Sequence, residues 1–285
     1  MIPASFDYES PRTLDEAVAL LGSREDAKLL AGGHSLLPTM KLRLAAPALL
    51  VDLSRIAGLN RIREVGERIA IGAMTTHADI ASSDLLFRLS PLLASAAAQI
   101  GDVQVRNRGT IGGSLAQAHP SADYPAAILA LDAEIVAISK SGERVIKARD
   151  FFTGMFTTEL RDDEIITEIR VPRTNGSGTA YKKFHHPASG YAVVGVAVVV
   201  KGTPARIETA NIGITGLSQN AYRATAVEQA LRGNGADAIA QAAQHAAEGA
   251  ESVGDTYASP EYREHLARVM TRRALVEALG RKRGK

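Results

Sequence analysis

The chain has 285 residues, of which 46% are hydrophobic, and its 33 Lys and Arg nearly balance 31 Asp and Glu, for a formal net charge of +2. This composition is typical of a globular protein and argues against a dedicated nucleic-acid binder, which concentrates basic residues. Because the chain has no cysteine, its own side chains cannot form a disulfide, an iron–sulfur cluster or a cysteine zinc site.

Neither an export signal nor a membrane span is expected. The first residues contain neither a basic start nor an apolar run, unlike a secretory signal peptide. The longest apolar run, residues 191–200, is about half of the ~20 residues that a membrane-spanning helix needs, and its valines predict a buried strand. We therefore expect a cytoplasmic protein that does not span a membrane.

The first 57 residues predict a small subdomain of strands and helices. Thr13-Leu14-Asp15-Glu16 has the form of a capping box, and apolar residues at helical spacing follow it as far as Gly22. Short apolar runs at residues 27–31 and 49–53 predict two strands. The first of these strands leads into Gly32-Gly33, which predicts a tight turn.

Residues 58–175 predict a second subdomain. Its expected elements are strands at 68–73, 134–138 and 164–171, two helical stretches within 80–98 broken near Pro91, and a short helix at 125–131. Residues 101–114 are polar and rich in glycine and predict a long loop. Loops of this length inside a compact domain are usually functional or disordered.

After a turn-rich stretch, residues 176–285 predict a third domain. Its expected elements are strands at 181–184, 191–200 and 206–213, helices at 221–231 and 236–248, and a final helix with Ser259 as its N-cap and Pro260 in its first turn. Strands followed by segregated helices indicate an α+β architecture.

Two glycine-rich segments are candidates for a ligand site: residues 31–36 (AGGHSL) and 109–114 (GTIGGS). Adjacent glycines let the backbone approach a ligand and turn its N–H groups inward, and Ser35, Thr110 and Ser114 add hydroxyl groups. A pyrophosphate needs this combination of several donors without obstructing side chains. The alternative is that both segments are ordinary turns at strand ends.

Other motifs favour simpler interpretations. No GxxxxGK[ST] sequence is present, and the G-x-G-x-x-A string at 233–238 follows a predicted helix and not a strand, which indicates a helix–helix turn. The seven histidines do not have metal-ligand spacing. His119, Ser121 and Asp123 could suggest a Ser/His/Asp hydrolase, but no G-x-S-x-G nucleophile elbow accompanies them, which disfavours that function. Asp123 is expected either to accept hydrogen bonds from a sugar or adenine or to cap the helix that follows, and Tyr191 either to cover a planar cofactor or to pack as a core or edge residue.

Residues 31–43 (AGGHSLLPTMKLR) and 110–123 (TIGGSLAQAHPSAD) resemble the two flavin signatures of the FAD-binding medium subunits of molybdenum hydroxylases. The resemblance runs nearly end to end and includes residues 190–197 (GYAVVGVA) and 259–263 (SPEYR). It is greatest to the carbon monoxide dehydrogenase branch, to which His34 also points, and xanthine dehydrogenase carries a related flavin domain.

The resemblance implies an α+β fold with three parts. Residues 1–57 and 58–175 would form a two-subdomain FAD-binding fold of the vanillyl-alcohol oxidase (PCMH) type. Residues 176–285 would form a C-terminal α+β domain with a three-stranded antiparallel sheet and a helical bundle, and FAD would lie extended between these parts.

The resemblance also implies a set of FAD-binding residues and no catalytic or metal-ligating ones. The first segment would cradle the pyrophosphate, the second would add donors, Gln117 and Asp123 would lie near the ribityl or ribose part, and Ile166, Lys182 and Tyr191 would contact the flavin ring. The full set is Ala31, Gly32, Gly33, His34, Ser35, Leu36, Leu37, Thr75, Thr110, Gly112, Gly113, Ser114, Gln117, Asp123, Ile166, Lys182 and Tyr191.

As function, the resemblance implies an electron-transfer subunit. Electrons would pass from [2Fe–2S] clusters in a small partner subunit, which receives them from a large molybdenum-cofactor subunit, through FAD to an external acceptor. A dimer of heterotrimers is implied, whereas the substrate and the acceptor stay open. The alternatives are a stand-alone FAD-linked oxidoreductase of the same fold and a non-redox anion-binding module.

Overall fold

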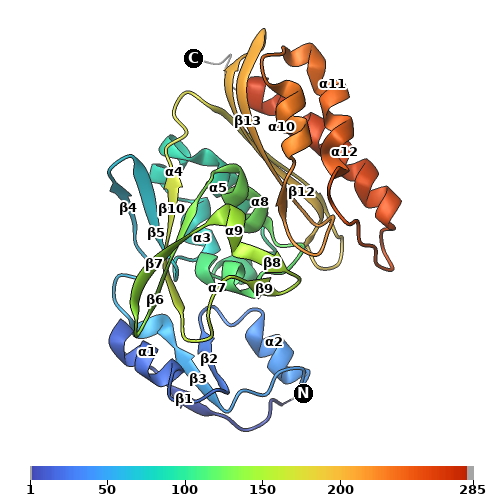
Figure 1. The fold of residues 1–285 in the computed structure, drawn as a ribbon. Helices are drawn as coiled ribbons and strands as arrows, with labels where there is room; N and C mark the ends of the chain where they lie inside the picture. Colours follow the sequence, from blue (N-terminus) through green and yellow to red (C-terminus); the bar gives the residue numbers. More distant parts are fainter. Residues whose placement is uncertain (1, 281–285) are drawn as a thin grey trace.

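Three large β-sheets follow one another along the chain in the computed structural model, which describes residues 2–280 (Figure 1). The first sheet is parallel, in the order β1-β3-β2, with β1 (Asp7–Glu9), β2 (Ala27–Leu30) and β3 (Leu49–Asp52). It is flanked by α1 (Leu14–Leu21), α2 (Leu36–Lys41) and the 3-10 turn η1 (Leu53–Arg55). The capping box is confirmed, because Thr13 Oγ1 accepts from the Glu16 N–H while the Glu16 carboxylate accepts from the Thr13 N–H.

The second sheet is antiparallel, in the order β4-β5-β10-β6-β7. Its strands are β4 (Ile62–Val65), β5 (Arg68–Gly72), β6 (Glu134–Ser139), β7 (Gly142–Lys147) and β10 (Ile165–Pro172). The helices of this part are α3 (His77–Ala81), α4 (Asp84–Leu89), α5 (Pro91–Ala97), α6 (Val103–Arg106), α7 (Ile111–Gln117), α8 (Asp123–Ala130) and α9 (Ala148–Phe151). A small hairpin of β8 (Phe152–Gly154) and β9 (Thr157–Thr158) completes it.

The third sheet, called here the C-terminal sheet, is antiparallel in the order β11-β12-β13-β14. Its strands are β11 (Gly178–His185), β12 (Ala192–Thr203), β13 (Arg206–Thr215) and β14 (Tyr222–Arg223). The helices after it are α10 (Thr225–Leu231), η2 (Ala236–Ala238), α11 (Ile239–Ala242), η3 (Ala243–Ala247) and α12 (Pro260–Gly280). Three of these strands match the expected ones, and the two-residue β14 adds a fourth.

The two faces of the C-terminal sheet belong to different cores. Helices α5 and α8 lie between this sheet and the second one, and α12 covers the opposite face (Figure 1). Along β12, Ala197 and Val199 therefore pack in the central core, whereas Val196, Val198 and Val200 pack against the C-terminal helices. This burial on both faces explains the uninterrupted apolar run that predicts the strand.

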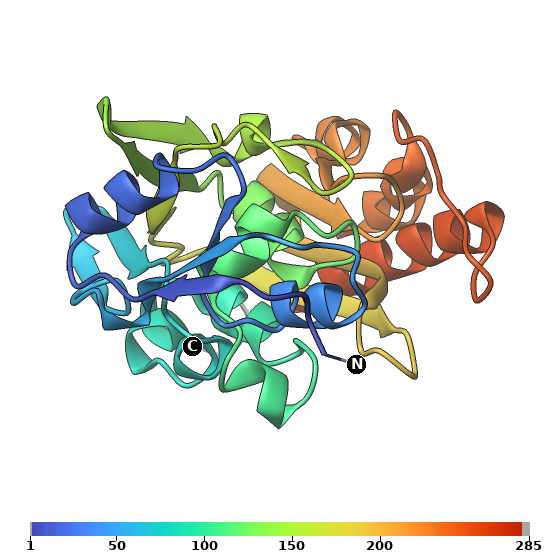
Figure 2. The same ribbon diagram turned by 90° about the horizontal axis from the view of Figure 1, so that it is seen from below.

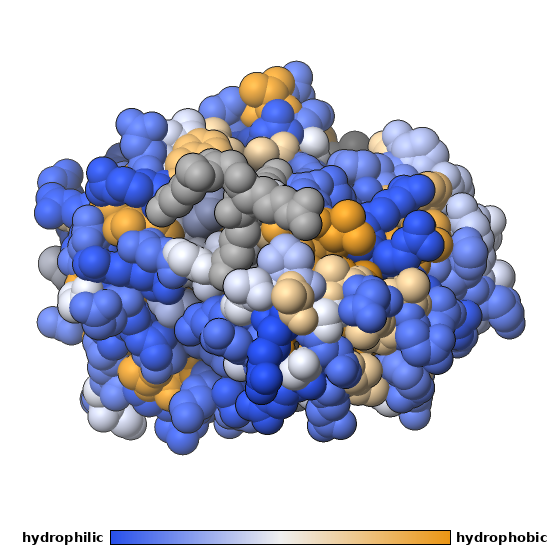
Figure 3. All heavy atoms as spheres, turned by 90° about the horizontal axis from the view of Figure 1, so that it is seen from above, coloured by the Kyte–Doolittle hydropathy of each residue, from blue (hydrophilic) through white to orange (hydrophobic). Residues whose placement is uncertain are grey.

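One face of the molecule is largely polar. The face seen from above carries mainly hydrophilic side chains with small hydrophobic areas between them (Figure 3). Seen from below, the N-terminal strands cross the middle of the molecule in front of the green helices (Figure 2).

Among residues 2–280, no helix combines the length and the hydropathy that crossing a bilayer requires.

Several expected elements differ from the observed ones. Residues 101–114 are not one loop, because they contain α6 and the first turn of α7. The stretch 80–98 holds parts of three helices and not two, since Ser83 caps α4 and Pro91 opens α5. The expected helix at 236–248 is divided into η2, α11 and η3. At residues 101–114 and 236–248, tertiary contacts override the intrinsic conformational preference of the local sequence.

Gly213→Ala should destabilise the protein, because α8 lies directly on β13 at this point. A Cβ on Gly213 would be 2.1 Å from the Ala126 carbonyl oxygen, which belongs to a helix backbone that cannot move freely. We expect the free energy of unfolding to fall by about 1–3 kcal/mol in denaturant titrations. Gly22→Ala is the control, since its φ is −79° and its Cβ would be 3.5 Å from the nearest atom. Equal stability of the two variants would contradict the packing argument.

Candidate functional site

The first glycine segment follows β2 and ends where α2 begins. Gly33 has φ +74°, a conformation that glycine adopts without strain. Within the described residues, the backbone N–H groups of Gly33, His34, Ser35 and Leu36 have no protein acceptor. Four unpaired donors on consecutive residues suit an anionic ligand such as a pyrophosphate.

The second glycine segment is the start of a helix and not a free bend. Thr110 is the N-cap of α7, and its hydroxyl accepts from the Gly113 N–H at 3.2 Å. The Gly112 N–H donates to the Ala73 carbonyl at 2.8 Å. A Cβ on Gly112 would lie 2.6 Å from the Ala73 Cβ. Gly112 therefore serves close packing of α7 on the end of β5, and the Thr110 hydroxyl and Gly112 N–H are already engaged by protein groups.

The two segments meet. A Cβ on Gly32 would lie 2.1 Å from the Arg108 carbonyl oxygen, and a Cβ on Gly113 would lie 3.4 Å from the Ala31 Cβ. Beside this contact lies a cavity of about 1020 Å³, large enough for an extended dinucleotide. The expected site residues that line it are Ala31, Gly32, Gly33, His34, Ser35, Leu36, Thr110, Gly112, Gly113, Ser114, Gln117, Asp123, Ile166 and Tyr191.

Three expected site residues do not line this cavity. Leu37 lies under Gly33, within 2.9 Å of where its Cβ would be. Thr75 is fully buried, and its hydroxyl has no hydrogen-bond partner among residues 2–280. Lys182 points to the far face of the C-terminal sheet, where it pairs with Glu277 of α12. Successive side chains of a strand alternate between faces, so the inward position belongs to Lys183.

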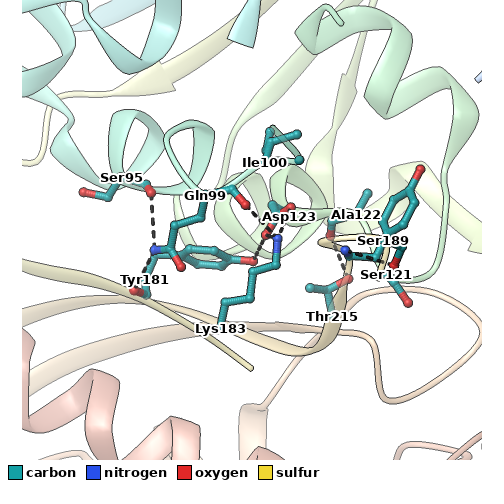
Figure 4. Close-up of polar contacts among 12 residues, drawn as sticks. Ser95, Gln99, Ile100, Ser121, Ala122, Asp123, Tyr181, Lys183, Ser189 and Thr215 are labelled. Carbon is teal, nitrogen blue, oxygen red and sulfur yellow. Dashed lines mark hydrogen bonds and ion pairs between the residues drawn. The ribbon is translucent and has the colours of Figure 1, made fainter. Parts of the chain in front are cut away.

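Asp123 lies in a buried polar cluster at the cavity wall (Figure 4). Its carboxylate accepts from the Tyr181 hydroxyl at 2.6 Å and from Lys183 Nζ at 2.9 Å. The Lys183 ammonium also donates to the Gln99 carbonyl at 2.8 Å. Burial raises the pKa of Asp123, and the Lys183 ammonium and the Tyr181 hydroxyl oppose this rise by favouring the carboxylate.

Aromatic side chains gather at the cavity's edge. The ring of His119 stacks on Tyr191 with 4.3 Å between centroids and meets Phe156 edge-on at 5.2 Å. Tyr191 is 39% exposed and Phe156 50%. Burial lowers the pKa of His119, so this ring is neutral at physiological pH. This group, His119, Phe156 and Tyr191, is called here the aromatic rim.

His77 is a cavity residue that the sequence analysis missed. It follows the N-cap Thr76 of α3, and its Nδ1 lies 3.2 Å from the buried Tyr124 hydroxyl. Burial, the largest cause, together with electrostatic interactions with His34 and Arg106, lowers the pKa of His77 to about 4. Further lining residues without a sequence signal include Met74, Ile100, Val105, Phe156 and Arg161.

Comparison with known proteins decides the family. The family model described as "FAD binding domain in molybdopterin dehydrogenase" matches residues 4–174, and the model described as "CO dehydrogenase flavoprotein C-terminal domain" matches residues 179–278. The chain belongs to the FAD-binding flavoprotein family of the molybdopterin dehydrogenases. The resemblance to this family and the α+β fold are thus confirmed.

Members of this flavoprotein family with different substrates resemble the chain almost equally. It is 42% identical to the carbon monoxide dehydrogenase medium chain of Hydrogenophaga pseudoflava over 99% of both chains. It is 39% identical to the nicotine 6-hydroxylase medium subunit of Paenarthrobacter nicotinovorans over 95% of this chain and 96% of the relative. A solved structure of carbon monoxide dehydrogenase from H. pseudoflava, at 43% identity, matches with a TM-score of 0.95 and covers 99% of both chains.

The depressed pKa of His77 should make this flavoprotein less stable in acid. Between pH 6.5 and about 4 the unfolded chain binds a proton at this imidazole that the folded chain does not. The free energy of unfolding therefore falls as the pH drops through this range, by roughly 3 kcal/mol. Denaturant titrations at both ends of the range should show a smaller pH-dependent loss in His77→Gln. The exposed control His265→Gln should behave like the wild type, and a His77→Gln variant that does so too would contradict the assignment.

Proposed function

We propose that this chain binds FAD in the cavity between the two glycine segments and transfers electrons from a partner subunit to an external acceptor. The observation that carries the proposal is the row of unpaired N–H groups from Gly33 to Leu36 beside a cavity of dinucleotide size, in a chain of the FAD-binding family. FAD supplies the redox chemistry, and the protein binds, orients and shields it.

The residues of the cavity have distinct parts in this proposal. The N–H groups of the first segment bind the pyrophosphate, and Ser114 and Gln117 add polar side chains from α7. Ile166 supplies an apolar wall, and Tyr191 of the aromatic rim covers the flavin ring from the cavity's edge. Asp123 lines the cavity, but its carboxylate is already bound by Tyr181 and Lys183, and Lys183 does not line the cavity, so we assign neither residue a direct bond to FAD.

The partners are proposed from the relatives. Both curated relatives are described as medium chains or subunits, which indicates complexes with further chains. We propose a small iron–sulfur subunit that delivers electrons and a large molybdenum-cofactor subunit that oxidises the substrate, in a cytoplasmic dimer of heterotrimers. We also propose that the chain divides into residues 1–57, 58–175 and 176–285.

We propose that the large subunit, and not this chain, selects the substrate. Carbon monoxide and nicotine occur in the names of relatives with 42% and 39% identity, so similar medium chains belong to enzymes named for different substrates. Co-purification from the native source with metal analysis tests the assembly. Molybdenum and iron in two accompanying chains would support it, whereas substrate turnover by this chain alone would support a stand-alone oxidoreductase.

Gly33→Val should abolish FAD retention. A branched side chain at φ +74° distorts the segment whose N–H groups bind the pyrophosphate, so we expect at least a ~10-fold loss of affinity in a fluorescence titration of the full chain with FAD. Gly58→Val is the matched control, because Gly58 has φ +87° and open space around it, outside the cavity lining. Both variants carry a similar backbone strain. Equal FAD affinity in the two variants would contradict the assignment of the pyrophosphate to the first segment.

Tyr191→Ala should change the reactivity of bound flavin more than its retention. Removing the ring exposes the edge of the cavity but leaves the first segment intact. We expect faster quenching of bound-flavin fluorescence by iodide, with an FAD affinity close to that of the wild type. Tyr262→Ala, which removes an exposed tyrosine outside the cavity lining, serves as control. Unchanged quenching in Tyr191→Ala would remove the covering role.

A further inference from the structure

The last five residues of the second signature, His119 to Asp123, are bound mainly by the C-terminal sheet. The Ala192 N–H donates to the Ser121 carbonyl at 3.2 Å, and the Gly216 N–H donates to the Pro120 carbonyl at 2.9 Å. The Thr215 hydroxyl lies 2.8 Å from the Pro120 carbonyl oxygen and 2.9 Å from that of Ala122. We call residues 119–123 the docking segment.

A buried ion pair closes this contact at the end of the docking segment. The Lys183 side chain has no exposed surface, and that of Asp123 is 3% exposed (Figure 4). Because Lys183 also donates to the Gln99 carbonyl, one ammonium group joins β11 to the end of α5 and the start of α8. Removing one partner of such a buried pair leaves an uncompensated charge, so separating β11 from the docking segment is energetically costly.

The same contact fixes the place of Tyr191. This residue lies on the turn between β11 and β12, between the inward-facing Lys183 and Ala192, which is bonded to the docking segment. On its other side the turn touches the cavity wall, where a Cβ on Gly190 would lie 3.5 Å from the Gly101 Cα. The Tyr191 ring then stacks on His119, the first residue of the docking segment.

We propose that Asp123 and Lys183, with Thr215, are positioning residues that fix the C-terminal sheet against the docking segment and thereby hold Tyr191 stacked on His119 at the cavity's edge. This inference deepens the proposed function, on which its flavin readout rests. It assigns Asp123 a role between two parts of the fold and not at the cofactor's sugar. The rings of the aromatic rim then come together only when the C-terminal sheet is bound to the docking segment.

The test uses the full chain and the NMR signals of the His119 ring protons, which stacking on Tyr191 shifts upfield. Assignment comes from His119→Gln, and Tyr191→Ala defines the unstacked position. In the double variant Asp123→Asn/Lys183→Met, which removes both buried charges together, we expect the His119 signals to move to the Tyr191→Ala position. Adding Tyr191→Ala to the double variant should then produce no further shift.

Lys182→Met is the matched control, because it removes the neighbouring lysine of the same strand on the opposite face. It should leave the His119 signals unchanged. If the double variant does not fold, Thr215→Val tests the positioning role instead, since it removes only a hydroxyl and keeps the side-chain shape. We expect its His119 signals to move in the same direction. His119 signals at the wild-type position in either folded variant would overturn the proposal.

A second readout separates this inference from the proposed function. In FAD-loaded protein, iodide quenching of the double variant should rise to the level of Tyr191→Ala. Quenching that stays at the wild-type level, with FAD bound, would also overturn the positioning role. Failure of the wild type to bind FAD would instead contradict the proposed function, while the His119 shifts, which need no ligand, would still decide the positioning role.

Discussion

The cavity depends on one backbone contact. Gly32 lies so close to Arg108 that a Cβ would come within 2.1 Å of the carbonyl oxygen. This contact brings the end of β2 and its row of unpaired N–H groups to the start of α7. A side chain at position 32 would separate the N-terminal sheet from the helices of the second sheet. The polar walls of the cavity therefore depend on a residue that contributes only backbone.

The side of the cavity next to the C-terminal sheet depends on a different kind of interaction. The C-terminal sheet meets the rest of the protein through apolar packing of α5 and α8, which is non-directional and does not by itself specify one register. The hydrogen bonds to the docking segment and the Asp123–Lys183 pair are directional. They add a defined register to a contact whose stability comes mainly from burial.

The sequence predicted the family, the order of the main strands and both glycine segments, because these depend on local patterns and on long signatures. It did not predict α7 as a helix, since two adjacent glycines have low helix propensity, whereas in the structure Gly112 packs on Ala73 and Gly113 lies against Thr110 and Ala31. The family resemblance assigned Lys182 to the site, whereas the alternation of side chains along β11 puts Lys183 on the inward face and Lys182 beside α12. His77 carried no signal, because its burial arises from contacts distant in sequence.

The two-faced burial of β12 links the parts of the molecule mechanically. This strand contributes different side chains to the central core and to the core under α12, so displacing it from one core disturbs the packing of the other. The turn that carries Tyr191 at the cavity's edge comes directly before this strand, so the packing of β12 on both faces limits how far that turn can be displaced. In the proposed function, a strand packed on both faces would keep the cavity's edge in place while partner chains dock, because two packed layers oppose its displacement.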